Sequence, residues 1–174
     1  MRENDLQIRT AGRGDLKLLA ALGVTTCYEA YFELDPSDAL AAYCALAFNL
    51  EQLKTELDDP AATFLIAETR GRAVGYAKLR EGKTVECLAG RHAIEVQRIY
   101  LLEKVKGRGF GRLLLERCRE LGRAKGYAAL WLGVWEKNVG AQRFYERMGM
   151  KCVGETDFSD GANEFINHVY AVDL

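Results

Sequence analysis

The chain has 174 residues, of which 24 are Lys or Arg and 25 are Asp or Glu, so its formal net charge is only −1. A chain of this length folds most simply as one domain over residues 1–174, and such a domain buries roughly 70% of the surface that its unfolded form exposes. The balanced charge excludes the global positive field of a nucleic-acid-binding protein, so we expect no nucleic-acid partner.

Cysteine, histidine and hydropathy exclude further classes of protein. The five cysteines show no C-x-x-C spacing and mostly lie among apolar residues, which is typical of reduced thiols in a cytoplasmic protein. With only two histidines, we expect neither a Ser-His-Asp triad nor a bound metal. The N-terminal residues MRENDLQIRT lack the apolar run of a signal peptide, and no segment reaches the ~18 apolar residues of a membrane span. We therefore expect a cytoplasmic protein with no membrane partner.

The first half of the chain predicts a strand, three helices and a hairpin. Residues 6–11 have strand character, and Asp15 is a suitable N-cap for a helix that begins at Leu16. Residues 28–34, YEAYFEL, are dense in aromatic rings and carboxylates. They either extend this helix or its loop as a solvated surface, or form a wall for a cationic, partly apolar substrate. Helices over about 38–48 and 50–57 then precede strands at 63–68 and 73–79.

The second half predicts alternating strands and helices. After a loop over 81–91, residues 93–101 alternate as a strand, with Glu95, Gln97, Ile99 and Leu101 on one face. Apolar residues from Phe110 to Leu121 recur at helical spacing, and Gly126 closes this helix. A buried strand at 128–134, a helix capped by Asn138 and ending at Gly149, and strands at 151–153 and 165–172 complete the pattern.

A glycine loop joins the strand at 93–101 to the following helix. Its three glycines permit positive φ and close approach to a ligand, and the first N–H groups of the helix form a natural anion site. With Lys106, Arg108 and Arg112, the loop predicts a site for phosphate or pyrophosphate, the alternative being a tight turn with solvated basic residues. Walker and dinucleotide motifs both fit poorly, since Arg112 stands where one needs Lys and the other Gly or Ala.

The strand, KGRGFG loop, helix and strand, followed by Asn138-x-x-Ala141-x-x-Phe144-Tyr145-x-x-x-Gly149-Met150, resemble the GNAT superfamily of acetyl-CoA-dependent N-acetyltransferases. The family's loop pattern, Gln/Arg-x-x-Gly-x-Gly/Ala, matches Lys106, Gly109 and Gly111 with Lys at its first position. The strings EVQRIYL (95–101), LGVWEKN (132–138) and YEAYFELDP (28–36) are most similar to bacterial polyamine (spermidine/spermine) N-acetyltransferases. The resemblance implies an α/β (α+β) fold. Its central sheet is mixed, mostly antiparallel and twisted, with about seven strands flanked by helices, and it is splayed between the strands at 93–101 and 128–134.

The resemblance also implies an acetyl-CoA site and a catalytic acid. Loop amides hold the pyrophosphate, the strand end accompanies the pantetheine, and the later helix completes the set: Ile99, Tyr100, Leu101, Lys106, Gly107, Arg108, Gly109, Phe110, Gly111, Arg112, Asn138, Phe144 and Tyr145. Tyr145 donates a proton to the departing coenzyme A sulfur, or else it packs on a core-facing helix stripe.

The acceptor amine must lose a proton before it attacks, and Glu95 is the first candidate for the base, with Glu103 or a water chain as alternatives. An exposed strand carboxylate is the other interpretation of Glu95. The acceptor expected from the resemblance is a polyamine bound by Tyr28, Glu29, Glu33 and Glu95. A peptide, protein or amino-acid N-acetyltransferase and a non-catalytic coenzyme-A-binding regulatory module are the alternatives, as either a monomer or a homodimer.

Overall fold

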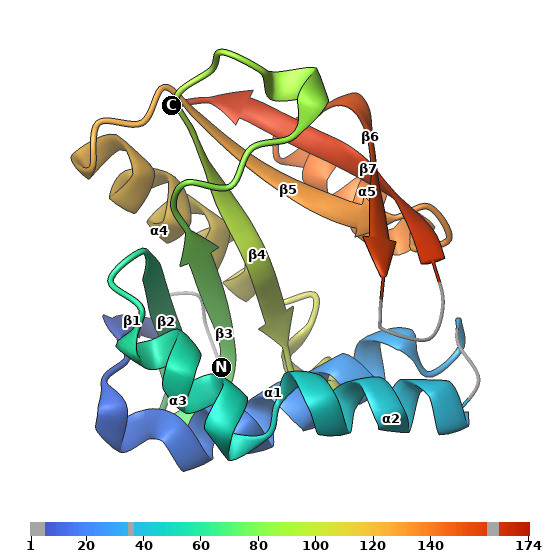
Figure 1. Ribbon diagram of the computed structural model, residues 1–174. Helices are drawn as coiled ribbons and strands as arrows, with labels where there is room; N and C mark the ends of the chain where they lie inside the picture. Colours follow the sequence, from blue (N-terminus) through green and yellow to red (C-terminus); the bar gives the residue numbers. More distant parts are fainter. Residues whose placement is uncertain (1–5, 35–36, 160–163) are drawn as a thin grey trace. The chain divides into compact units, whose positions relative to one another are not determined.

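A computed structural model describes residues 6–34, 37–159 and 164–174, so Asp35 and Pro36 of the YEAYFELDP string lie outside the described residues. Within these ranges the chain has five α-helices and seven strands, and the strands form one mixed sheet in the order β1-β2-β3-β4-β5-β7-β6 (Figure 1). The predicted mixed, mostly antiparallel sheet of about seven strands is confirmed.

The described chain forms two compact units. The first lies within Met1–Leu79 and Arg98–Arg117, and the second within Arg80–Gln97 and Cys118–Leu174. Strand β4 (Ala93–Leu101) and helix α4 (Phe110–Ala124) each contribute to both units. The single domain over 1–174 stays a prediction.

The first unit contains β1 (Leu6–Thr10), α1 (Leu16–Tyr31), α2 (Ser37–Ala47), α3 (Leu50–Asp58), β2 (Ala62–Thr69) and most of β3 (Arg72–Arg80). The three helices pack against one another and α3 packs on β2 (Figure 1). Their core is built from buried apolar side chains, among them Leu19, Leu22, Leu53, Phe64 and Ile66. Gly23 is required inside α1, because a Cβ there would lie 2.3 Å from the Phe48 ring.

Of two local predictions in the first unit, the one on Asp15 needs correction and the one on residues 28–31 agrees with the structure. Asp15 stands at the N-cap of α1 but makes no capping bond there; its carboxylate accepts the Gly12 N–H at 2.9 Å and both ends of the Arg9 guanidinium at 2.8 Å. These bonds hold the pKa of Asp15 below its usual value, with the Arg9 hydrogen bond as the largest cause. Residues 28–31 extend α1 to Tyr31, as the helical interpretation of YEAYFEL predicts.

The second unit contains β5 (Ala129–Trp135), α5 (Val139–Arg147), β6 (Lys151–Ser159) and β7 (Glu164–Asp173). Strand β7 is antiparallel to both β5 and β6. The predicted strand at 151–153 is too short, because the pairing of β6 with β7 continues to Ser159. The parallel register of β4 with β5 runs from Ala93 opposite Ala129 to Glu95 opposite Trp131.

The thiols, the helices and the possible metal ligands of the described residues bear on the classes of protein that composition excludes. Cys27, Cys44 and Cys118 are buried and belong to no disulfide, whereas Cys152 is exposed. In the described ranges no helix combines the length and apolarity needed to cross a membrane. The same residues include no group of three or more His, Cys, Asp or Glu side chains placed to hold a metal ion.

Candidate functional site

The glycine loop lies between two buried anchors of the first unit. Val105 ends a 3₁₀ turn (Glu103–Val105), Phe110 begins α4, and both side chains are fully buried. Between them Gly107 has φ 74° and Gly109 has φ 79°, a conformation that side chains other than glycine rarely adopt. The Leu113 amide makes the first helical bond, to the Gly109 carbonyl at 3.2 Å. The amides of Phe110, Gly111 and Arg112 lie ahead of that bond, where a helix offers its N–H groups to an anion.

The side chains around this loop are not all available to an anion. Lys106 forms an ion pair with Glu103, and the Glu103 amide in turn donates to a Glu29 carboxylate oxygen at 2.8 Å. Arg108 and Arg112 are exposed. The loop therefore presents its backbone amides beside the exposed Arg108, and a carboxylate from α1 holds the turn that precedes it.

The end of β4 in the first unit places Ile99, Tyr100 and Leu101 in partly buried positions. β3 has a glycine beside them, because a Cβ on Gly75 would lie 2.4 Å from the Tyr100 carbonyl oxygen. The Tyr100 ring lies 6.0 Å from that of Tyr76 and 6.5 Å from that of Tyr31. Burial raises the pKa of Tyr100 well above its usual value, so its hydroxyl stays protonated.

The predicted acceptor residues on α1 and just after it differ in their surroundings in the first unit. Tyr28 is partly buried, with its ring 5.9 Å from that of Phe32, which is 56% exposed. Glu33 is exposed, whereas Glu29 is occupied by the Glu103 amide. The interpretation of Glu29 as a purely solvated or substrate-facing acid missed this backbone contact.

Helix α5 of the second unit carries the other predicted cofactor residues. The Asn138 side-chain oxygen accepts the Ala141 amide at 3.1 Å and so caps the helix, as predicted. Phe144 is partly buried and meets the Tyr145 ring edge-on at 5.2 Å. Tyr145 is 8% exposed, with its ring 6.2 Å from that of Tyr170. Tyr145 thus packs on a core-facing stripe, which leaves its chemical role a prediction.

Glu95 lies in the second unit, and the interpretation of it as an exposed strand carboxylate is wrong. It is 7% exposed, and its Oε2 accepts the Arg80 Nε–H at 2.7 Å. Its other oxygen, Oε1, accepts no hydrogen bond from the described residues. Arg80 therefore fixes one oxygen of the Glu95 carboxylate, and the other oxygen can accept a hydrogen bond from a further donor.

Comparison with known proteins decides the family. The acetyltransferase (GNAT) family model matches residues 25–150. The chain belongs to the GNAT family. It is 29% identical over 144 residues to an uncharacterized N-acetyltransferase of Lactobacillus delbrueckii subsp. lactis, covering 83% of each chain. It is 34% identical over 118 residues to an uncharacterized N-acetyltransferase of Mycobacterium bovis, covering 68% of this chain and 71% of the relative.

Solved GNAT structures share the fold. The PaiA N-acetyltransferase of Thermoplasma acidophilum, solved in complex with coenzyme A, superposes with a TM-score of 0.74 at 18% identity, over 97% of this chain and 99% of that one. As a GNAT protein the chain is an acetyl-CoA-dependent N-acetyltransferase. The positive-φ glycines and the amides that begin α4 fit the pyrophosphate of this cofactor.

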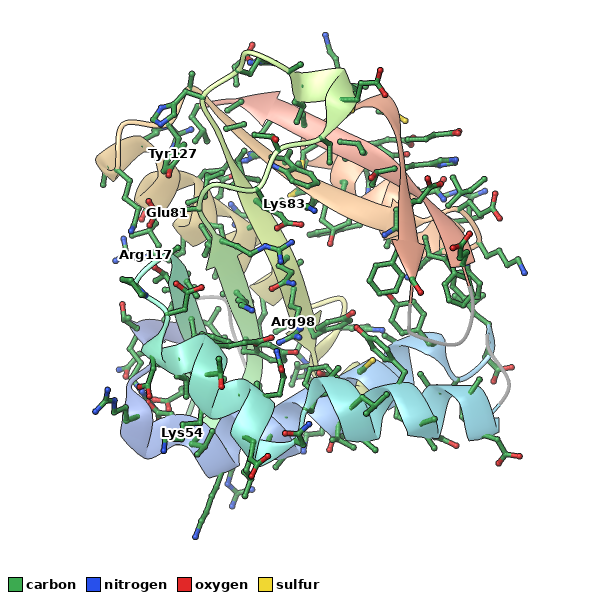
Figure 2. All side chains as sticks on the ribbon, in the orientation of Figure 1. Lys54, Glu81, Lys83, Arg98, Arg117 and Tyr127 are labelled. Atoms are coloured by element: carbon green, nitrogen blue, oxygen red, sulfur yellow. The ribbon has the colours of Figure 1, made fainter. Side chains whose placement is uncertain are left out.

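One group of charged residues in the GNAT chain escaped prediction from the sequence: Glu56, Lys78 and Arg98, named here the Glu56 cluster. Its members lie on α3, β3 and β4 of the first unit and are all buried; Arg98 points from β4 toward the helices (Figure 2). The Arg98 Nη1 and Nη2 groups donate to Glu56 at 2.6 and 3.1 Å, and Lys78 Nζ lies 2.9 Å from the same carboxylate. Burial acts to raise the pKa of Glu56, but Arg98 and the other donors outweigh it and hold that pKa below its usual value. The sequence does carry a signal for this cluster, because Lys78 and Arg98 each lie within a largely apolar strand. A charged side chain is buried in such a strand only when it is paired with an opposite charge.

Proposed function

We propose that the enzyme transfers an acetyl group to the primary amine of a small cationic molecule, with a polyamine such as spermidine or spermine as the first candidate. The observation that carries the proposal is the loop at Gly107 and Gly109, with its positive φ angles, and the start of α4 directly after it. This geometry supports a pyrophosphate-binding role of the kind on which the family's cofactor depends.

We assign the cofactor contacts to named groups of the chain. The amides of Phe110, Gly111 and Arg112 bind the pyrophosphate, and the exposed Arg108 adds positive charge. The Lys106 ammonium contributes less, because Glu103 already pairs with it. The Ile99–Leu101 backbone and Asn138 bind the pantetheine arm, and a main-chain N–H near Leu101 polarises the carbonyl. When bound, acetyl-CoA supplies an acetyl group activated as a thioester.

Glu95 is the base in this proposal. An aliphatic amine with a pKa of about 10 is mostly protonated near neutral pH, and it must lose a proton to become a nucleophile. Glu95 takes this proton through Oε1, directly or through a water, while Arg80 fixes the carboxylate through Oε2. Glu103 is a weaker candidate, because its side chain is engaged by Lys106.

Tyr145 is the acid. Its phenol supplies a proton to the departing sulfur, and its packing against Phe144 fixes the ring. The same packing is consistent with a structural role alone, so kinetics must separate the two.

The end of α1 supports a cationic acceptor. Tyr28 and the exposed Phe32 offer ring faces to methylenes and ammonium groups, and the exposed Glu33 offers a carboxylate. Glu29 has a smaller share in acceptor binding than the sequence predicts, because its oxygen holds the Glu103 amide.

A substrate panel tests the proposal. Thiol release from acetyl-CoA is measured with spermidine, spermine, free amino acids and a short peptide, for the wild type and for Glu33→Gln, with Glu51→Gln as a control at an exposed glutamate of α3. We expect acetylation of a small amine, with KM for cationic acceptors raised only by Glu33→Gln. A preference for the peptide contradicts the acceptor class. Coenzyme A binding without thiol release on any amine favours the regulatory module.

A further inference from the structure

The sheet of the second unit is open to solvent at Gly133. Strand β5 lies between β4 and β7, and six of its seven residues are buried (Figure 1). Gly133 is the exposed one. Because the residues on either side of it along the strand are buried, the layer that covers β5 is interrupted at this position. The interruption gives a small molecule access to an inner strand.

The opening at Gly133 lies next to the Glu95 carboxylate. The parallel register of β4 with β5 ends with Glu95 opposite Trp131, and residues opposite each other point to the same face of a sheet. Gly133 follows Trp131 by two residues, so it belongs to that face and lies about 7 Å further along the strand. With neighbouring strands about 4.8 Å apart, the Cα atoms of Gly133 and Glu95 are roughly 8 Å apart. A group held over Gly133 is therefore within reach of the Glu95 side chain.

Aromatic side chains bound the opening along β5. Trp131 is 2% exposed and belongs to one buried cluster with Val85 and Leu88 of the loop before β4. Trp135, two residues beyond Gly133, is 9% exposed, and its ring centre lies 5.2 Å from that of Phe165. Between the two indoles the floor is the bare backbone of a glycine. Such surroundings suit the methylenes of an alkyl chain.

One polar side chain reaches over this floor. Asn167 of β7 stands opposite Trp135, and a Cβ on Gly133 would lie 3.2 Å from its Nδ2 and 3.4 Å from its Cβ. The Asn167 side chain is half-buried and makes no hydrogen bond to any described residue. Its amide oxygen can accept from an N–H donor. The opening thus has a hydrogen-bond acceptor at Glu95 Oε1 and a second one at Asn167 Oδ1.

We propose that the acceptor lies over Gly133, with its reacting amine at Glu95 and a second nitrogen bound by Asn167 Oδ1. The chemical class is an alkyl diamine or polyamine, in which a methylene chain joins the two nitrogens and passes between the indoles. Gly133 and Asn167 are then specificity-determining residues: the glycine leaves room for the chain, and the asparagine binds the second nitrogen. The inference rests on the proposed transfer to a primary amine with Glu95 as the base.

A matched pair of acceptors tests the inference in the wild-type enzyme. Putrescine and n-butylamine have the same carbon chain and one reacting primary amine, and they differ by the second nitrogen. A hydrogen bond from a charged donor is strong enough to change kcat/KM about tenfold or more. We expect putrescine to exceed n-butylamine by at least that factor.

Two variants of Asn167 should shift this preference in opposite directions. Asn167→Leu keeps the size of the side chain and removes its acceptor, so it should lower kcat/KM for putrescine about tenfold and leave the value for n-butylamine unchanged. Asn167→Asp adds a negative charge beside the second nitrogen, so it should raise kcat/KM for putrescine alone. A residue that only packs on Gly133 would not improve one acceptor over the other.

The variant Gly133→Ala places a methyl group on the floor of the opening. It should raise KM for both amines about tenfold, the cost expected of overpacking, and leave the acetyl-CoA affinity in calorimetric titration unchanged. The matched control is Gly14→Ala in the first unit, at an exposed glycine where a Cβ would meet no atom within 4 Å. It should change none of these values.

The possible failures can be told apart. Equal kcat/KM for putrescine and n-butylamine in the wild type, or a preference that Asn167→Leu leaves intact, overturns the inference while acetyl transfer to amines stands. Absence of thiol release with every amine overturns the proposed function together with the inference. The wild-type comparison decides the matter even if a variant fails to fold.

Discussion

The variant Glu56→Gln should be the most destabilising single change of charge in the first unit. Glu56 accepts hydrogen bonds from Arg98 and Gln52 and forms an ion pair with Lys78, with every member of the cluster buried. Glutamine keeps the shape of the side chain but leaves two buried cations without their carboxylate. Removing one partner of a buried ion pair costs about 3–5 kcal/mol.

The expected magnitude is large on the scale of protein stability. Domains are typically stable by about 5–15 kcal/mol, so a loss of about 3–5 kcal/mol removes roughly a fifth or more of that stability. With a urea m-value of about 2 kcal/mol/M, the midpoint of unfolding should fall by about 2 M. Far-UV circular dichroism in urea at pH 7 measures it. The control is Glu51→Gln at an exposed position of α3, which should change stability by about 0.5 kcal/mol or less.

The pH dependence gives a second test with a definite sign. The pKa of Glu56 is lowered in the folded state, so its contribution is present above the unfolded value of 4.5 and is lost as the pH falls through the lower folded value. The difference in stability between the wild type and Glu56→Gln should therefore shrink below pH 4.5. Because the expected shift is about 2 M urea, a midpoint for Glu56→Gln within about 0.5 M of the wild-type midpoint would refute the reasoning. A stability difference between the two proteins that grows as the pH falls would refute it as well.

Further changes at four positions test the cofactor loop, the turn that precedes it and the acid. Gly109→Val should weaken acetyl-CoA binding at least tenfold in calorimetric titration, because valine strongly disfavours a φ of 79°, whereas Lys106→Gln should change the affinity less than about threefold since the amides remain. Equal affinities would remove the backbone argument. Tyr145→Phe should lower kcat about 10²–10⁴-fold with little change in acetyl-CoA affinity, and an unchanged kcat with chemistry rate-limiting would return Tyr145 to a packing role. Glu29→Ala should raise the KM for acetyl-CoA and Glu29→Gln should not, because glutamine still accepts the Glu103 amide; a loss confined to the acceptor KM in both variants would instead restore Glu29 to substrate binding.

Elements with strong local patterns could be predicted from the sequence. The alternation over residues 93–101 gives β4 with its observed bounds, and the apolar spacing after Gly109 gives the start of α4 at Phe110. β6 was predicted too short because most of its side chains are exposed and polar, so alternation of burial is weak there and pairing with β7 supplies the order.

Contacts between distant residues could not be predicted. Glu56 and Arg98 are 42 residues apart, and Glu29 and Glu103 are 74 apart, so no spacing rule connects them. The sequence identified Glu95 as a candidate base but could not supply its partner Arg80, because that choice depends on which strands meet. The family resemblance identifies the residues of the glycine loop and α5 as cofactor-binding candidates. Which of their side chains already bind other groups of the chain is seen only in the structure.

The position of β7 between β5 and β6 affects how the chain is made. Both neighbours precede β7 along the sequence, so a growing chain on the ribosome exposes them before the strand that joins them. Until then each presents a row of unpaired N–H and C=O groups, which other extended segments can pair with and chaperones can shield. Once β7 is in place, β6 remains at the edge, and the bulge between Cys152 and Gly154 interrupts its ladder. Such an interruption twists an edge away from flat stacking, so the finished protein is better protected from strand-mediated aggregation than its nascent form.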